Sequence, residues 1–156
     1  FYVPAGGDIP DINENSKFAH KLQFIAEMTS HFGVNKPQTE VLVGDLNIAP
    51  LASDVWSSKQ LLKIVSHTPV ETDGLKRLIA DGGWHDAVRA YFGDEQKLYS
   101  WWSYRARDWA TSDRGRRLDH IWVSLDLADR IVMAEIHCGL RGADKPSDHV
   151  PISLTL

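Results

Sequence analysis

Residues 41–50 read Val-Leu-Val-Gly-Asp-Leu-Asn-Ile-Ala-Pro, an apolar run that ends in a glycine and two polar positions. Three apolar residues in succession between polar turns predict a strand that is buried on both faces. Asp45 and Asn47 are two residues apart, which places both side chains on the same side of an extended chain. A carboxylate and a carboxamide there can hold a hard cation or a water molecule. Asp and Asn also favour turns, so this stretch alone supports a site and a turn equally.

Two further polar clusters lie beside predicted strands, at residues 117–120 (Arg-Leu-Asp-His) and 147–149 (Ser-Asp-His). A buried carboxylate needs a counter-charge or a metal, so these clusters predict one shared site if their strands converge. We expect His149 to donate to a phosphate oxygen and Asp119 to set its tautomer. Taken singly each cluster is weak, because Asp119 could instead pair with a neighbouring arginine. Together they predict a divalent-metal phosphodiester hydrolase.

The composition indicates one ordinary globular domain. The 156 residues carry a net charge of −4, so any affinity for nucleic acid must come from a local patch, a metal or residues outside this sequence. Cys138 is the only cysteine, which fits a reducing cytoplasm, and we expect it to be a small core residue. No apolar stretch approaches membrane-spanning length. Because the sequence opens at Phe1 with what resembles the end of a strand, we expect it to be part of a larger protein.

Hydrophobic periodicity predicts two long helices. The first is capped by Asn15 or Ser16, repeats apolar residues every three or four positions and stops at Gly33. The second begins at a Thr-Pro-Val-Glu capping box at residues 68–71 and ends at the glycine pair 82–83.

Shorter elements are expected in the remainder of the chain. They are a helix over 85–91, strands over 99–104, 118–124 and 131–138, and a last strand over 150–156 in which apolar and polar residues alternate. Helices and strands therefore interleave, which predicts a layered α/β sandwich.

The segment 99–117 interleaves aromatic residues with arginines. Aromatic faces can stack on bases or fill the space of a missing base, and arginines bind phosphates. A core strand beside a solvated basic loop is the alternative, but a tryptophan pair is costly to place in a loop. The residues are Tyr99, Trp101, Trp102, Tyr104, Arg105, Arg107, Trp109, Arg114, Arg116 and Arg117. This pattern favours DNA as the substrate.

Most of the histidines show no ligand spacing, and we interpret them as surface or hydrogen-bonded structural residues. They are His20, His31, His67, His85 and His137. The sequence does not decide the role of His120, which lies beside Asp119.

Several motifs in a fixed order resemble those of the exonuclease III family, which contains abasic-site endonucleases and 3′ exonucleases of the endonuclease/exonuclease/phosphatase superfamily. The matching stretches are residues 2–7 (YVPAGG), 44–50 (GDLNIAP), 100–105 (SWWSYR), 114–119 (RGRRLD) and 145–151 (KPSDHVP), together with Lys17, Phe18 and Lys21. Any one motif is weak, whereas their order and spacing are specific. The resemblance implies a DNase I-like, four-layer fold with a mixed β-sheet flanked by helices.

The resemblance also implies roles for individual residues in cleaving double-stranded DNA with Mg²⁺ or Mn²⁺. Asp45 would position or deprotonate the attacking water, His149 would bind the phosphate oxygen, and Asp119 would orient His149. The implied metal ligands are Asp45, Asn47, Asp148 and His149, and Tyr2 and Asn47 would contact the phosphate. The implied DNA contacts are Lys17, Trp101, Trp102, Tyr104 and Arg105, with Lys21 as a further candidate for the DNA backbone.

The resemblance covers only the C-terminal part of a family domain, across residues 1–156. Family members begin with a longer segment that contains an Asn and a metal-binding Glu, and nothing here matches them. We therefore expect this stretch alone to be impaired in catalysis and to have an uncovered apolar face.

No membrane and no obligate protein partner are expected, and the bacterial relatives imply a cytoplasmic location. The sequence leaves three alternatives open: a DNA-repair nuclease, a phosphodiesterase acting on RNA or a lipid head group, and a non-catalytic DNA-binding fragment.

Overall fold

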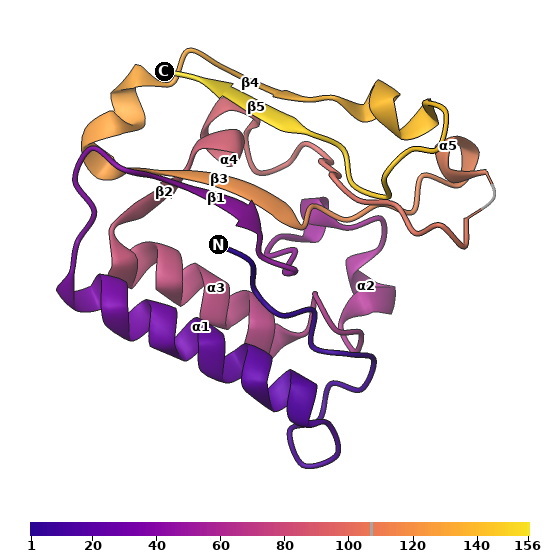
Figure 1. Ribbon diagram of the computed structural model, residues 1–156, viewed down its shortest axis with the longest axis horizontal. Coiled ribbons are helices and arrows are strands. Elements are labelled where there is room, and N and C mark those ends of the chain that lie inside the picture. Colours follow the sequence, from indigo (N-terminus) through magenta and orange to yellow (C-terminus); the bar gives the residue numbers. More distant parts are fainter. Residues whose placement is uncertain (107) are drawn as a thin grey trace.

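The computed structural model describes residues 1–106 and 108–156, which form a helical layer, a central sheet and a second small sheet (Figure 1). Helices α1 (Ser16–Val34) and α3 (Pro69–Gly82) pack on each other and cover one face of the central sheet. The central sheet has the order β1-β3-β2, and all its named strands pair antiparallel. Its strands are β1 (Val41–Asp45), β2 (Trp84–Asp86) and β3 (Asp119–Ser124). The layered α/β prediction is confirmed.

The second sheet pairs β4 (Met133–Ile136) with β5 (Ile152–Thr155) and packs on β3 and α4 (Ala87–Phe92). The remaining elements are short: η1 (Ala52–Asp54), α2 (Ser58–Leu61), α5 (Trp109–Ser112), η2 (Leu125–Arg130) and η3 (Cys138–Gly142). No helix within the described residues is long and apolar enough to cross a membrane.

The two predicted long helices are confirmed with their predicted N-caps, but α1 continues past the expected stop at Gly33 to Val34 and is capped by Asn35. The side chain of Asn15 accepts hydrogen bonds from the backbone N–H groups of Lys17 and Phe18, which are free at a helix start. Helix α3 begins with the capping box formed by Thr68 and Glu71 and ends at Gly83, whose φ of 70° is one that glycine adopts without strain. The facing apolar residues of α1 and α3 join the main core beneath the central sheet.

Strand β1 is buried on one face only, so the prediction of two buried faces is wrong. Leu42 lies in the core beneath the helices, but Val41 and Val43 are 47% and 53% exposed. The second sheet packs over β3 rather than over β1, which leaves these valines uncovered among the described residues. Residues 1–3 run beside the outer edge of β1 in the same direction, with Phe1 N bonded to Val43 O and Val3 N to Asp45 O.

Several shorter predictions need correction. Residues 84–86 form β2 rather than a helix, and α4 begins only at Ala87, because Asp86 caps it by accepting from the N–H of Arg89. Residues 99–104 are extended but make only isolated bridges, at Trp101. The predicted strand 131–138 is shortened to β4. Cys138 is exposed at the start of η3 and is therefore not a core residue.

Candidate active site

The three polar clusters meet at one end of the central sheet. Asp45, the last residue of β1, is directly opposite Asp119, the first residue of β3, and His149 lies just before β5. One ligand atom from each of the three residues lies within 4.8 Å of the others. His149 Nδ1 is 2.8 Å from Asp119 Oδ2, and its Nε2 is 4.0 Å from Asp45 Oδ2. The predicted convergence of these residues is confirmed.

A close backbone approach at Gly44 allows this arrangement. Gly44 has φ 155°, and a Cβ atom there would lie 1.7 Å from the carbonyl oxygen of Phe1. Any larger residue would therefore push residues 1–3 away from β1. Those residues matter to the site, because the carbonyl of Val3 accepts a hydrogen bond from Asn47 Nδ2.

Asn47 is held tightly against Asp45. Its backbone N–H donates to Asp45 Oδ1 and its side-chain Nδ2 donates to Asp45 Oδ2, each at 2.9 Å. Asn47 has φ 53°, a left-handed conformation that asparagine tolerates better than most residues. Both donors of the amide group are used, so its Oδ1 atom is left as the acceptor or metal ligand. The turn and the site that the sequence left as alternatives are thus the same structure.

A buried ion pair supports the backbone of Asn47. Lys21 is fully buried and pairs with Glu71, and it also donates to the carbonyls of Ala5 (3.3 Å) and Asn47 (2.8 Å). Burial lowers the pKa of Lys21, an effect that Glu71 opposes. Lys21 therefore has no surface with which to contact DNA, and the expectation that it touches the DNA backbone is wrong.

The electrostatics of the site favour protons on two groups. The hydrogen bond from His149 to Asp119 raises the pKa of the imidazole, and the charges of Asp119, Asp45 and Asp148 add to this against the effect of burial. Burial raises the pKa of Asp45, and the nearby Asp119 carboxylate adds to the effect, while the hydrogen bond from Asn47 opposes it. Both shifts favour the protonated form of the group relative to the same side chain in free solution.

Ser100 was not singled out from the sequence, although it lies in a quoted motif. Its Oγ donates to Asp119 Oδ2 at 2.7 Å and accepts from the N–H groups of Leu118 and Asp119. It is fully buried. Ser100 therefore fixes Asp119, which in turn fixes His149.

Asp119 does not pair with Arg117, so that alternative is wrong. Arg117 is fully buried and binds Asp54 and Asp86 instead, and Arg89 also binds Asp54. Burial alone would raise the pKa of Asp54, but the two arginines hold it below its ordinary value. This ion cluster anchors the start of β3 from beneath the site.

His120, whose role the sequence did not decide, is buried and hydrogen-bonded, and so is His67. His120 Nε2 contacts the carbonyl of Ile48 at 2.9 Å, and His67 bridges Ser58 and the carbonyl of Ala49. Both brace the loop that follows Asn47.

A pocket of about 580 Å³ opens beside His149 and Asn47. Trp101 lies in its wall, and Trp101 Nε1 donates to Asp148 Oδ2 at 2.9 Å. Asp148 therefore lies outside the group of Asp45, Asp119 and His149, where it orients the tryptophan. Trp102 is buried in a core cluster with Tyr99 and does not line this pocket.

The other predicted DNA contacts lie on the surface around the site. Arg105 lines the pocket and is exposed, and Tyr104 is exposed with its hydroxyl bonded to the carbonyl of Pro146. Tyr2 and Lys17 are also exposed. Arg107, part of the predicted basic segment, lies outside the described residues.

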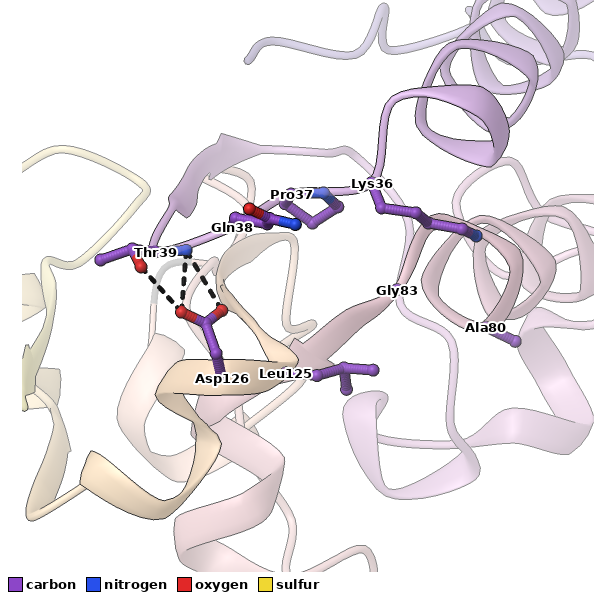
Figure 2. A pocket seen from close by; sticks show the side chains of 8 residues that line it. All are labelled: Lys36, Pro37, Gln38, Thr39, Ala80, Gly83, Leu125 and Asp126. Carbon is purple, nitrogen blue, oxygen red and sulfur yellow. Dashed lines mark hydrogen bonds between the residues drawn. The ribbon is translucent and has the colours of Figure 1, made fainter.

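A second hollow, of about 640 Å³, lies at the opposite end of the central sheet (Figure 2). There Asp126 accepts hydrogen bonds from the backbone N–H and the hydroxyl of Thr39, which leaves its carboxylate occupied. The walls are mostly backbone and aliphatic groups, including Pro37, Ala80 and Leu125. Among its described lining residues the titratable side chains are Lys36 and Asp126.

The donor set at the active site fits a hard divalent cation. Ligand atoms of Asp45, Asp119 and His149 lie within 4.8 Å of one another, and Asn47, whose amide is bonded to Asp45, adds a free Oδ1 atom. A cation there would relieve the repulsion between Asp45 and Asp119. Mg²⁺ typically takes one or two protein carboxylates and completes its shell with water and substrate phosphate. Few protein ligands are therefore sufficient.

Comparison with known proteins identifies the family to which this fold and site belong. The Endonuclease/Exonuclease/phosphatase family matches residues 35–149, and the chain belongs to this family. It is 33% identical over 145 residues to exodeoxyribonuclease III of Haemophilus influenzae, covering 88% of this chain and 54% of that protein. The chain thus spans about half the length of this curated relative.

Solved structures agree with this assignment. An AP endonuclease from Archaeoglobus fulgidus superimposes with a TM-score of 0.86 at 28% identity, over 97% of this chain and 57% of that one. A 3′ phosphatase from Neisseria bound to a product DNA hairpin gives a TM-score of 0.88 at 27% identity, over 99% and 58%. The DNase I-like fold expected from the resemblance is confirmed.

Proposed function

We propose that the protein is a Mg²⁺- or Mn²⁺-dependent DNA-repair nuclease that hydrolyses phosphodiester bonds at abasic sites and 3′ ends of double-stranded DNA. The observation that carries the proposal is the pairing of His149 with Asp119 within reach of Asp45. The named relatives, which include an exodeoxyribonuclease and a 3′ phosphatase bound to DNA, support DNA as the substrate.

The chemistry is in-line attack of water on phosphorus. Asp45 accepts the proton of the attacking water, a task that suits a carboxylate with a raised pKa. His149 donates from Nε2 to a phosphate oxygen, and Asp119 holds the ring by its Nδ1. Asn47 and Tyr2 contact the phosphate from the adjoining loop and the N-terminal segment. A bound divalent cation, held by Asp45 and Asn47 with Asp148 nearby, would neutralise charge on the phosphate, while the Nε2 proton of His149 remains available for the phosphate oxygen.

DNA would lie across the pocket mouth. Arg105 and Lys17 are exposed cations that would contact the DNA backbone, and Tyr104 would lie beside them. Trp101 would pack against the sugar of the abasic site, and Trp102 would support Trp101 from the core. Since the net charge is −4, this local patch must supply the attraction.

The test compares substrates and variants on the purified full-length protein. An abasic duplex and a 3′-phosphate duplex should be cleaved with Mg²⁺ or Mn²⁺ and not in EDTA, and should be preferred over RNA and over a phosphoinositide. Asp45→Asn and His149→Ala should each lower kcat by about 10²–10⁴-fold. Asp73→Asn, an exposed carboxylate on α3, is the matched control. DNA binding that survives both variants without cleavage under any metal would show a binding module instead, and a preference for RNA or lipid would reassign the substrate.

A further inference from the structure

Arg116 is a largely buried cation with no carboxylate partner among the described residues. Its Nη1 donates to the carbonyl of Val65 at 3.2 Å and to Ser66 Oγ at 2.8 Å. Its Nε is buried without any hydrogen-bond partner in the described chain. The next residue, Arg117, is by contrast neutralised by Asp54. A desolvated guanidinium with unused donors costs stability, and such groups are kept where a ligand completes them.

The backbone register places this cation beside the catalytic imidazole. Trp101 forms antiparallel bridges with both Arg116 and His149, so the three residues lie across three adjacent extended segments. Residues directly opposite in such pairs project to the same face, and all three side chains line the same pocket. Two strand spacings separate the Arg116 backbone from that of His149, about 10 Å.

The pocket is positively charged on this side. The guanidinium of Arg116 stacks on the Trp101 ring at 5.4 Å from its centroid, and that of Arg114 on Trp56 at 4.8 Å. Arg105 also lines the pocket, and Asp8 is the one acidic residue in its described lining. A neutral sugar or base would accept hydrogen bonds from Arg116 but leave its charge uncompensated, whereas an oxyanion would neutralise that charge through charge-assisted hydrogen bonds.

We propose that Arg116 is a specificity-determining residue that binds an anionic substituent of the substrate, a carboxylate or a second phosphate, while His149 binds the scissile phosphate. The inference rests on the proposed nuclease function and names its preferred substrate class. The planar guanidinium matches either oxyanion, and stacking on Trp101 holds it in the orientation that such binding requires.

Binding in EDTA tests the inference separately from cleavage. Fluorescence anisotropy would compare two pairs of DNA hairpins that differ in one charge. The first pair ends in 3′-phosphoglycolate or in 3′-(2-hydroxyethyl) phosphate; the second carries a tetrahydrofuran site followed by an ordinary phosphate or by a methylphosphonate. The wild-type protein should prefer the anionic member of at least one pair by about tenfold, and the pair that responds identifies the anion.

Variants assign that preference to Arg116. Arg116→Leu should abolish it by weakening only the anionic member, and Arg116→Lys should restore part of it. Arg116→Gln keeps a donor for Ser66 and replaces the leucine variant if that protein does not fold. Arg77→Leu, which removes the same charge from the exposed face of α3, should leave the preference unchanged.

The outcomes separate the two proposals. Equal binding within both pairs, or an equal loss for both members in Arg116→Leu, overturns the role of Arg116. If metal-dependent cleavage of the same hairpins nevertheless occurs, the nuclease function stands. Failure to bind any of the hairpins in EDTA overturns the role of Arg116, and failure to cleave them with Mg²⁺ or Mn²⁺ as well overturns the nuclease function.

Discussion

The ammonium of Lys21 donates a 2.8 Å hydrogen bond to the backbone carbonyl of Asn47. This contact joins helix α1 to the active-site loop at a residue with φ 53°. Because Glu71 on α3 neutralises Lys21, the conformation of Asn47 depends on how the two helices pack. Packing beneath the sheet is thereby coupled to the geometry of the candidate active site.

Replacing Lys21 by Met should destabilise the protein by about 3–5 kcal/mol, because Glu71 would be left buried without its counter-charge. The double variant Lys21→Met/Glu71→Gln should recover part of this loss. Urea unfolding measures the stability of both variants. As the control, replacing Lys17, an exposed lysine one turn earlier, by Met should change stability by no more than about 0.5 kcal/mol. An equal effect at both lysines would contradict the interpretation.

Replacing Asp119 by Asn should lower the pKa of His149, because the carboxylate accepts its hydrogen bond and supplies negative charge. In the wild-type protein the raised pKa means that protonated His149 stabilises the fold at low pH, a contribution that fades as the pH rises through the folded-state pKa. The titration of the His149 ring protons, followed by NMR in EDTA, measures this directly. An unchanged titration in the variant would mean that Asp119 does not set the charge of His149.

Two glycines should respond to alanine in opposite directions. Gly44→Ala should cost about 1–3 kcal/mol, since the new Cβ would collide with the Phe1 carbonyl at a positive φ. Gly33→Ala has open space near the end of α1 and should gain about 0.5–1 kcal/mol from helix propensity. The denaturant midpoints of the two variants and the wild-type protein measure both changes. A Gly44→Ala protein as stable as the wild type would mean that residues 1–3 do not pack on β1.

Because of the ion cluster around Arg117, the free energy of unfolding should depend on pH in the acidic range. Burial would raise the pKa of Asp86, but Arg117 and His120 hold it below its ordinary range. A depressed pKa contributes stability above the unfolded-state value, about 3.9 for Asp, and the contribution is lost as the pH falls towards the folded-state pKa. The free energy of unfolding should therefore decline below about pH 4.

The variant Asp86→Asn tests the source of this acid dependence. Asparagine can still cap α4, so the change removes charge but retains the cap. The variant should lose about 3 kcal/mol near neutral pH and show a shallower decline in acid. A pH profile parallel to that of the wild type would exclude Asp86 as a source.

The long helices were predictable because their start and stop signals are local. Asn15 caps α1 and Thr68 and Glu71 cap α3 through contacts within a few residues. Strand burial was not predictable, because the exposure of Val41 and Val43 depends on where a distant sheet packs. The strand at residues 84–86 was not predictable for a similar reason, since it forms by pairing with β3, which is distant in sequence.

The residues of the candidate active site were predictable from the sequence, but the contacts that hold them in place were not. Asp45, Asp119 and His149 stand out through motif and chemistry, and the structure brings them together. Other contacts of the site were not predictable, because each joins segments that are distant in sequence. They are the Ser100–Asp119 bond, the Lys21–Glu71 pair and the Asp148–Trp101 bond. Trp101 and Trp102 alternate in direction along an extended chain, which explains why one faces the pocket and the other the core.

The bridges that join Arg116, Trp101 and His149 limit which changes in chain length this part of the protein tolerates. A single-residue insertion in either flanking segment would reverse the side-chain direction and remove one of these groups from the pocket. The described residues of the intervening turn that contains α5 form none of these bridges. Changes in the length of this turn would therefore alter the pocket entrance, which Ser103 and Arg105 line, while Trp101, Arg116 and His149 keep their relative positions.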